Sequence, residues 1–138
     1  MIPGPDAQRL KTQLMIFWMI WSALLAGLVV IYVFLGRGPV KPVVAADLPV
    51  NLAGLVPLFV SIVIRGLVLP RCSDIGRVLP VYIVGLALAE ACGLLGVFLG
   101  GPYRDSLFVL GVLGIASYVP VFVKRLLEPK GSGFIPNN

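Results

Sequence analysis

The residue with the clearest chemical potential is Glu90, a carboxylate within the apolar sequence LALAEACGLLG (86–96). It lies thirteen residues after Arg77 and eleven before Gly101, so a helix rising 1.5 Å per residue would place it near the middle of a bilayer. A charged side chain at that depth costs about 3 kcal/mol on insertion scales. We therefore expect Glu90 to be neutral, paired with a cation, or in contact with a wet cavity.

Two serines are expected at a similar depth. Ser22 follows Lys11 by eleven residues and Ser61 precedes Arg71 by ten, which brings both within about one helical turn of the level of Glu90. Carboxylate and hydroxyl oxygens are hard ligands that suit small cations. The sequence therefore predicts an ion-binding site for H⁺ or Na⁺ formed by Glu90, Ser61 and Ser22, with no other cofactor and no metal site.

Other roles for Glu90 remain open. A permanently protonated carboxyl could hydrogen-bond across helices and fix their register, in a structural or accessory subunit of a membrane complex without a transport role. The carboxylate could also pair with a basic residue of a partner protein. Within the chain, Arg65 is the one cation that lies inside an apolar segment and not at its last residue, and its long side chain could shorten the distance to Glu90.

Several classes of chemistry are excluded or disfavoured. The chain has no histidine, which rules out histidine metal sites and histidine general bases. Its two cysteines, Cys72 and Cys92, have no metal-binding spacing and are expected to be packing residues. There is no nucleotide-binding motif, so we expect no enzymatic activity. The net charge is +5, but the basic residues stand at the ends of apolar runs, which favours lipid headgroups over nucleic acid as partners.

The elements that would hold these residues are long apolar helices. Hydrophobic residues make up 59% of the 138-residue chain and charged residues only 12%, about half the charged fraction of soluble domains. Four unbroken apolar runs cover about residues 13–36, 48–69, 78–101 and 106–124, each close to the length that spans a bilayer. We predict an all-α membrane protein, one domain over residues 1–138, with four transmembrane helices in a compact bundle and a flexible tail at 128–138.

Prolines mark expected irregularities in three of these helices. Pro57 is expected to kink the second segment. Pro80 is expected in the first turn of the third segment, where proline is tolerated. Pro120 should bend or loosen the last turn of the fourth.

Lysine and arginine counts predict the orientation in the membrane. With four spans, the two chain ends and the second connection share one side, where eight basic residues fall: Arg9, Lys11, Arg65, Arg71, Arg77, Lys124, Arg125 and Lys130. The opposite side has three, namely Arg37, Lys41 and Arg104. The positive-inside rule therefore places both termini in the cytoplasm.

Small residues indicate where helices approach closely. The third segment has Gly85, Ala89 and Gly93 at four-residue spacing, followed by the pair Gly96 and Gly100. These positions could serve contacts within the chain or homo-oligomerisation, and both remain open. Trp21 lies too deep for the interfacial aromatic belt and is expected to pack inside the protein.

The sequence GLALAEACGLLG (85–96), with the basic loop around Pro70-Arg71 upstream, resembles the carboxylate-bearing helix of the proteolipid c subunit of rotary ATP synthases. The resemblance implies that Glu90 would be the ion-binding carboxylate and that the second and third segments would form a hairpin. The second segment departs from that pattern, because Pro57 and Arg65 stand where glycines would be expected.

The whole chain resembles a group of small, uncharacterised four-span bacterial membrane proteins. They share the ALAEA-type third span and a proline followed by basic residues at the end of the fourth, here Pro120 and Lys124-Arg125. This resemblance implies a multi-pass protein of the bacterial inner membrane. We expect it to form homo-oligomers or to associate with other membrane subunits.

Overall fold

The chain folds into long helices whose successive spans run in opposite directions, and a computed structural model describes residues 5–40, 42, 44–72 and 74–127. The described residues contain no strand. In chain order the elements are α1 (Pro5–Leu35), η1 (Ala45–Asp47), α2 (Leu48–Asn51), α3 (Leu55–Val63), η2 (Ile64–Val68), η3 (Leu69–Arg71), α4 (Ile75–Leu99), η4 (Gly101–Tyr103), α5 (Arg104–Ser117) and α6 (Pro120–Leu127). The expected flexible tail at 128–138 lies outside the described residues.

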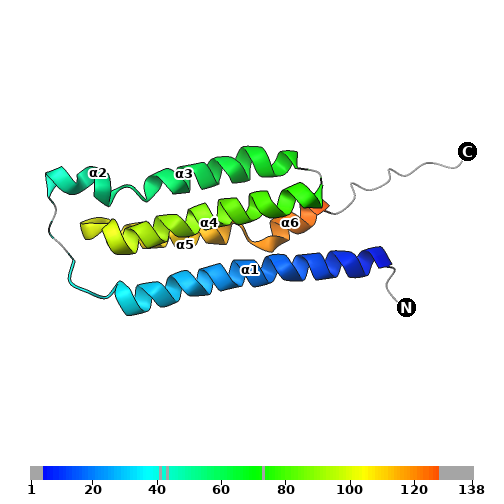
Figure 1. Cartoon of the computed structure of the whole chain (residues 1–138), viewed down its shortest axis with the longest axis horizontal. Coiled ribbons are helices and arrows are strands. Elements are labelled where there is room, and N and C mark those ends of the chain that lie inside the picture. Colours follow the sequence, from blue (N-terminus) through cyan, green and yellow to red (C-terminus); the bar gives the residue numbers. More distant parts are fainter. Residues whose placement is uncertain (1–4, 41, 43, 73, 128–138) are drawn as a thin grey trace, which may run out of the picture.

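Four helical segments are long and apolar enough to cross a membrane: Gln8–Leu35, Ala45–Arg71, Gly76–Leu99 and Gly101–Lys124. They confirm the predicted all-α architecture with four spans in one bundle. The start of α1, the connection between α3 and α4 and the end of α6 lie at the same end of the bundle (Figure 1). This is the architecture of a multi-pass membrane protein.

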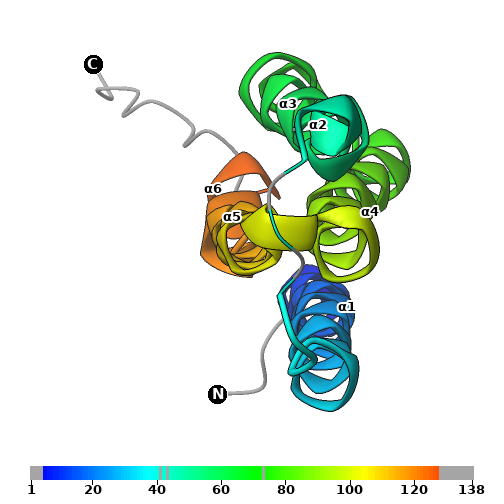
Figure 2. The same cartoon turned by 90° about the vertical axis from the view of Figure 1, so that its left-hand side faces the viewer.

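The helices are arranged around a central pair. In the end-on view α4 and α5 lie in the middle, with α1 on one side and α3 on the opposite side (Figure 2). The main contacts of α1 are with α4, α5 and α6, while α3 packs on α4 and α5. A site formed by side chains of both α1 and α3 would therefore have to extend across α4 and α5.

The second span is interrupted, but not in the way that its proline suggested. The helix breaks at residues 52–54, between α2 and α3, and Pro57 is the third residue of α3. Proline has no N–H for the carbonyl of Ala53 and crowds it. That carbonyl accepts a bond from the N–H of Val56 instead, which places the irregular turn before the proline.

The fourth span also breaks rather than bends. Its helix ends at Ser117 and a new helix begins with Pro120 at its first position. Pro120 has no N–H to donate to the Ala116 carbonyl oxygen, so that oxygen accepts a hydrogen bond from the Val119 N–H at 3.2 Å instead.

In the third span, the prediction for Pro80 was wrong. The helix starts at Ile75, so the proline is its sixth residue and lies inside a continuous helix.

The larger hydrophobic core lies in the half of the bundle near the start of α1. Tyr82 of α4 is fully buried at its centre, with ring contacts to Phe17 at 4.8 Å and to Tyr118 at 5.7 Å between centroids. A smaller cluster of Leu58, Cys92 and Leu107 lies toward the other end. Aromatic packing therefore joins α1, α4 and the α5–α6 junction in one layer.

Candidate functional site

Glu90 lies in the seam between α1 and α4. These two helices keep one register along the seam, because Phe17 meets Tyr82 and Leu28 meets Gly93, each pair 65 positions apart. The nearest position on α1 is Gly27, where an added Cβ would lie 3.9 Å from the Glu90 Oε1 atom. The glycine leaves room for the carboxyl in a seam that is otherwise filled by larger side chains.

The carboxyl of Glu90 is half-buried and has no polar partner in the part of the chain that the structure describes. Ala23 and Ala26 of α1 and Ala87 of α4 are small residues near the seam, and all three are exposed on the bundle surface. Glu90 therefore lies at the edge of the bundle, beside small residues that contacts within the chain do not cover.

The structure does not bring Ser22 to Glu90 as a free ligand. Ser22 is exposed on α1, and its hydroxyl donates to the carbonyl oxygen of Trp18 in the preceding turn at 2.5 Å. This local bond holds the hydroxyl against its own helix. The expectation of an oxygen ligand beside Glu90 is not met at this position.

Ser61 is separated from Glu90 by α4 itself. Its hydroxyl is buried and donates to the Gly85 carbonyl oxygen at 2.7 Å, on the side of α4 that faces α3. Glu90 is five residues beyond Gly85, which rotates it by about 140° around the helix. Ser61 and Glu90 therefore differ both in the face of α4 on which they lie and, by about 7.5 Å, in depth, so the predicted three-residue ion site does not assemble within this chain.

Arg65 does not pair with Glu90 within the chain either. Its guanidinium lies over the ring of Phe122 on α6, with Cζ 5.2 Å from the ring centroid. The Nε atom is buried and forms no hydrogen bond among the described residues. Arg65 lies at the opposite side of the central helix pair from the α1–α4 seam.

The small residues of α4 form close contacts within the chain. Alanine Cβ atoms at Gly85, Gly93 and Gly96 would overlap Tyr118, Leu28 and Leu107, respectively. Gly100 lies against the backbone of Arg104, and Ala89 is fully buried next to Gly111 and Gly114 of α5. All five positions predicted for packing therefore serve the internal bundle, mostly the seam between α4 and α5.

A buried polar network, which the sequence reasoning did not predict, connects all four spans. The Tyr118 hydroxyl donates to the Ser61 carbonyl oxygen at 2.6 Å, and the Tyr82 hydroxyl donates to the Tyr118 carbonyl oxygen at 2.8 Å. From α1, the Trp21 indole N–H donates to the Ile115 carbonyl oxygen at 2.8 Å. The prediction that Trp21 packs inside the protein is thereby confirmed.

The break at Pro120 explains why these donors gather at one level. When a helix ends inside a bilayer, its last carbonyls need other partners; here Tyr82 bonds the Tyr118 carbonyl, and Trp21 is a second donor to the Ile115 carbonyl, which also accepts the Tyr118 N–H. The sequence shows Pro120 two residues after Tyr118, but it does not show which aromatic donors of the other spans lie opposite the break. The Tyr118 hydroxyl competes with the backbone N–H groups of α3 for the Ser61 carbonyl oxygen. Just beyond Ser61, the helix widens into the π-helical segment η2.

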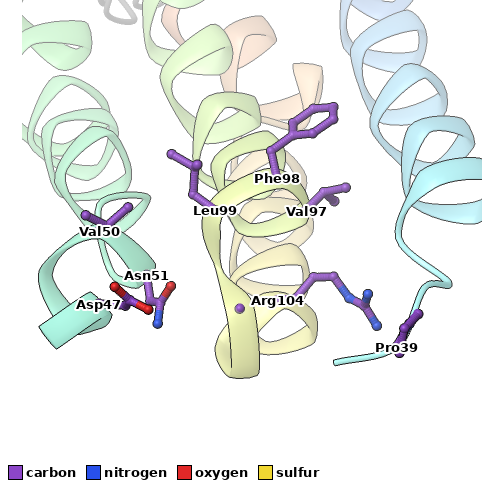
Figure 3. A pocket seen from close by; sticks show the side chains of 9 residues that line it. Pro39, Asp47, Val50, Asn51, Val97, Phe98, Leu99 and Arg104 are labelled. Atoms are coloured by element: carbon purple, nitrogen blue, oxygen red, sulfur yellow. The ribbon is translucent and has the colours of Figure 1, made fainter. Parts of the chain in front are cut away.

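A polar pocket of about 280 Å³ lies at the opposite end of the bundle (Figure 3). Asp47 and Asn51 line one wall, and Arg104 points toward Pro39 on the other side. The arginine is already engaged: Nη1 donates to the Gly38 carbonyl oxygen at 2.8 Å and Nε donates to Asp105 at 3.2 Å. Its bonds hold the loop after α1 against the start of α5.

Substituting Gly101 at the floor of this pocket by alanine is expected to lower the free energy of unfolding by about 1 kcal/mol. Gly101 has φ +49°, and its Cβ would lie 3.0 Å from the Asn51 Oδ1 atom. Thermal unfolding in detergent measures the effect. Gly38→Ala is the control, because nothing lies within 4 Å of its Cβ position; equal stability of the two variants would contradict the prediction.

Comparison of the chain with protein-family models, with curated proteins and with solved structures finds no match.

Proposed function

We propose that this protein is a non-enzymatic, multi-pass membrane component whose Glu90 carboxyl reversibly binds a proton in the α1–α4 seam. The observation that supports the proposal is the position of Glu90: it is half-buried opposite Gly27, with no polar partner among the described residues. Ionisable residues at membrane depth are expensive and commonly mark ion or proton pathways.

Of the two ions considered, the geometry favours H⁺. A sodium ion needs several oxygen ligands at once, whereas the Ser61 hydroxyl lies on the other side of α4 and the Ser22 hydroxyl is held against its own helix. A proton needs only the carboxylate. The resemblance of residues 85–96 to the c-subunit helix is compatible with the same role for Glu90.

The proposal includes association with further subunits. The small exposed residues Ala23, Ala26 and Ala87 lie near Glu90, and small residues permit close helix approach in lipid. A second copy or another membrane subunit packed there would enclose the carboxyl. We further propose a bacterial inner membrane location with both termini cytoplasmic, which reporter fusions to each end would check.

Carbodiimide labelling tests the proton-binding role. A hydrophobic carbodiimide reacts with protonated carboxyls in membranes, so labelling of Glu90 should fall as the pH is raised from about 5 to about 9. Mass spectrometry of the full-length protein in liposomes gives the labelled fraction. Glu90→Gln should abolish the label, and Gly27→Leu should slow it by filling the space opposite the carboxyl.

The alternative is a structural or accessory subunit with a permanently protonated Glu90, favoured by the small exposed residues near it. This alternative predicts that carbodiimide labelling of Glu90 does not vary with pH. It also predicts that the Glu90→Gln variant has the same oligomeric state as the unaltered chain. Protection by Na⁺ at constant ionic strength would instead contradict the choice of H⁺. A lone monomer in mild detergent and in lipid would overturn the proposed association.

A further inference from the structure

A groove between α3 and α5 leads to Arg65, on the side of the central pair away from Glu90. It encloses about 300 Å³, and its apolar lining includes Leu58, Ile62, Gly66, Leu110 and Leu113. Ile62 and Leu113 are exposed, so the groove is open to the surrounding bilayer. From Leu58 to Gly66 it runs about 12 Å along the helix axis.

The arginine at the end of this groove lacks an anion. Its Nε–H is buried without an acceptor, and no carboxylate of the described chain forms an ion pair with it; the one ion pair there joins Arg104 and Asp105. The contact with Phe122 orients the guanidinium but accepts no N–H bond. A buried donor without a partner is costly, and guanidinium groups bind phosphate oxygens in a two-pronged geometry.

The depth of Arg65 suits a lipid headgroup that reaches slightly below the membrane surface. Ser61 and Tyr118 are hydrogen-bonded, and Arg65 and Phe122 each follow four residues later, so they lie about 6 Å nearer the membrane surface. Two exposed arginines, Arg71 and Arg77, lie beyond them at the same end of the bundle. They would add to the attraction for anionic lipid.

We propose that this groove binds an anionic phospholipid, with the phosphate on Arg65 and an acyl chain between α3 and α5. The apolar lining matches the chain, and the unpaired guanidinium matches the phosphate. The inference does not depend on the protonation of Glu90, because the two sites lie on opposite sides of the α4–α5 pair.

Native mass spectrometry of the purified full-length protein tests the proposal with two defined lipids, dioleoyl phosphatidylglycerol and dioleoyl phosphatidylcholine. The unaltered chain should retain the anionic lipid about tenfold more strongly. Arg65→Gln should remove most of that preference, and Arg65→Lys should restore part of it. Arg71→Gln makes the same charge change at an exposed arginine and should alter retention less than twofold.

Gly66→Leu tests the tail site separately. Nothing lies within 4 Å of the Gly66 Cβ position, so the added side chain fills the groove without a clash in the bundle; retention of both lipids should fall at least fivefold. Equal losses for Arg65→Gln and Arg71→Gln, or equal retention of the two lipids, would overturn the proposal. Complete displacement of the lipid by glycerol phosphate would also overturn the proposal. A dimer that occludes the groove and dissociates in the Arg65→Gln variant would overturn it as well.

Discussion

Gly111→Ala is expected to destabilise the bundle by about 3 kcal/mol, the upper end of the usual cost of overpacking. A Cβ atom at this position of α5 would lie 2.6 Å from the Gly93 nitrogen and 2.7 Å from its Cα atom. Both are backbone atoms of α4, so no side chain can rotate away to relieve the clash. The helices would have to separate along the seam that contains Ala89 and Gly114.

Reversible unfolding in mixed micelles, followed by circular dichroism or by a fluorescent probe, measures this loss. Gly66→Ala is the matched control because it adds the same methyl group to a helical glycine with nothing within 4 Å. Its stability should stay within about 0.5 kcal/mol of the unaltered chain. If Gly111→Ala were as stable as this control, α4 and α5 could not be in the contact described above.

Tyr118→Leu is expected to lower the free energy of unfolding by about 2 to 3 kcal/mol because it leaves a cavity. Tyr118→Phe is expected to lower it by about 1 kcal/mol because the hydroxyl is lost. The ring is buried against Tyr82 and Gly85, and its hydroxyl bonds to the Ser61 carbonyl. The same unfolding assay measures both variants. Phe59→Leu is the control, since Phe59 is an aromatic residue on the exposed face of α3.

A double-mutant cycle isolates the hydroxyl contact within this network. Ser61→Ala removes a hydroxyl that donates to the Gly85 carbonyl oxygen at 2.7 Å and, as the longer branch of a shared bond, to the Tyr118 oxygen at 3.2 Å. Combined with Tyr118→Phe, it should cost less than the sum of the two single changes, because each removes the partner of the other. Strict additivity would show that the Tyr118 and Ser61 hydroxyls do not interact.

The features predicted well from sequence depend on depth and composition. The lengths of the apolar runs and the placement of charged residues were sufficient to predict the four spans. The depth of Trp21 alone was sufficient to predict that it packs inward. The expected ion site failed because depth says nothing about rotation around the helix axis. Ser61 packs beside Gly85 on the side of α4 that faces α3, whereas Glu90 lies five residues further along α4 on the side that faces α1.

The prolines were predicted to disturb the right segments, but Pro57 and Pro120 disturb the turn before them, and Pro80 lies inside a continuous helix. A proline leaves the carbonyl four residues before it without its usual N–H partner. The helices therefore break at residues 52–54 and at 118–119, before Pro57 and Pro120, rather than at the prolines themselves. The network around Tyr118 follows from the second break. It could not be foreseen without knowing which aromatic donors of other spans lie opposite the carbonyls of Ile115 and Tyr118 at this break.

The partners of α1 have a consequence for the order of assembly during synthesis. This helix is made before the other three spans, yet its main contacts are with α4, α5 and α6, which follow the second span in the chain. Until they enter the bilayer, the Trp21 N–H lacks the Ile115 carbonyl, and Leu28 lacks the surface of Gly93. The nascent first span must therefore wait beside the insertion machinery or in lipid, and its docking completes the fold.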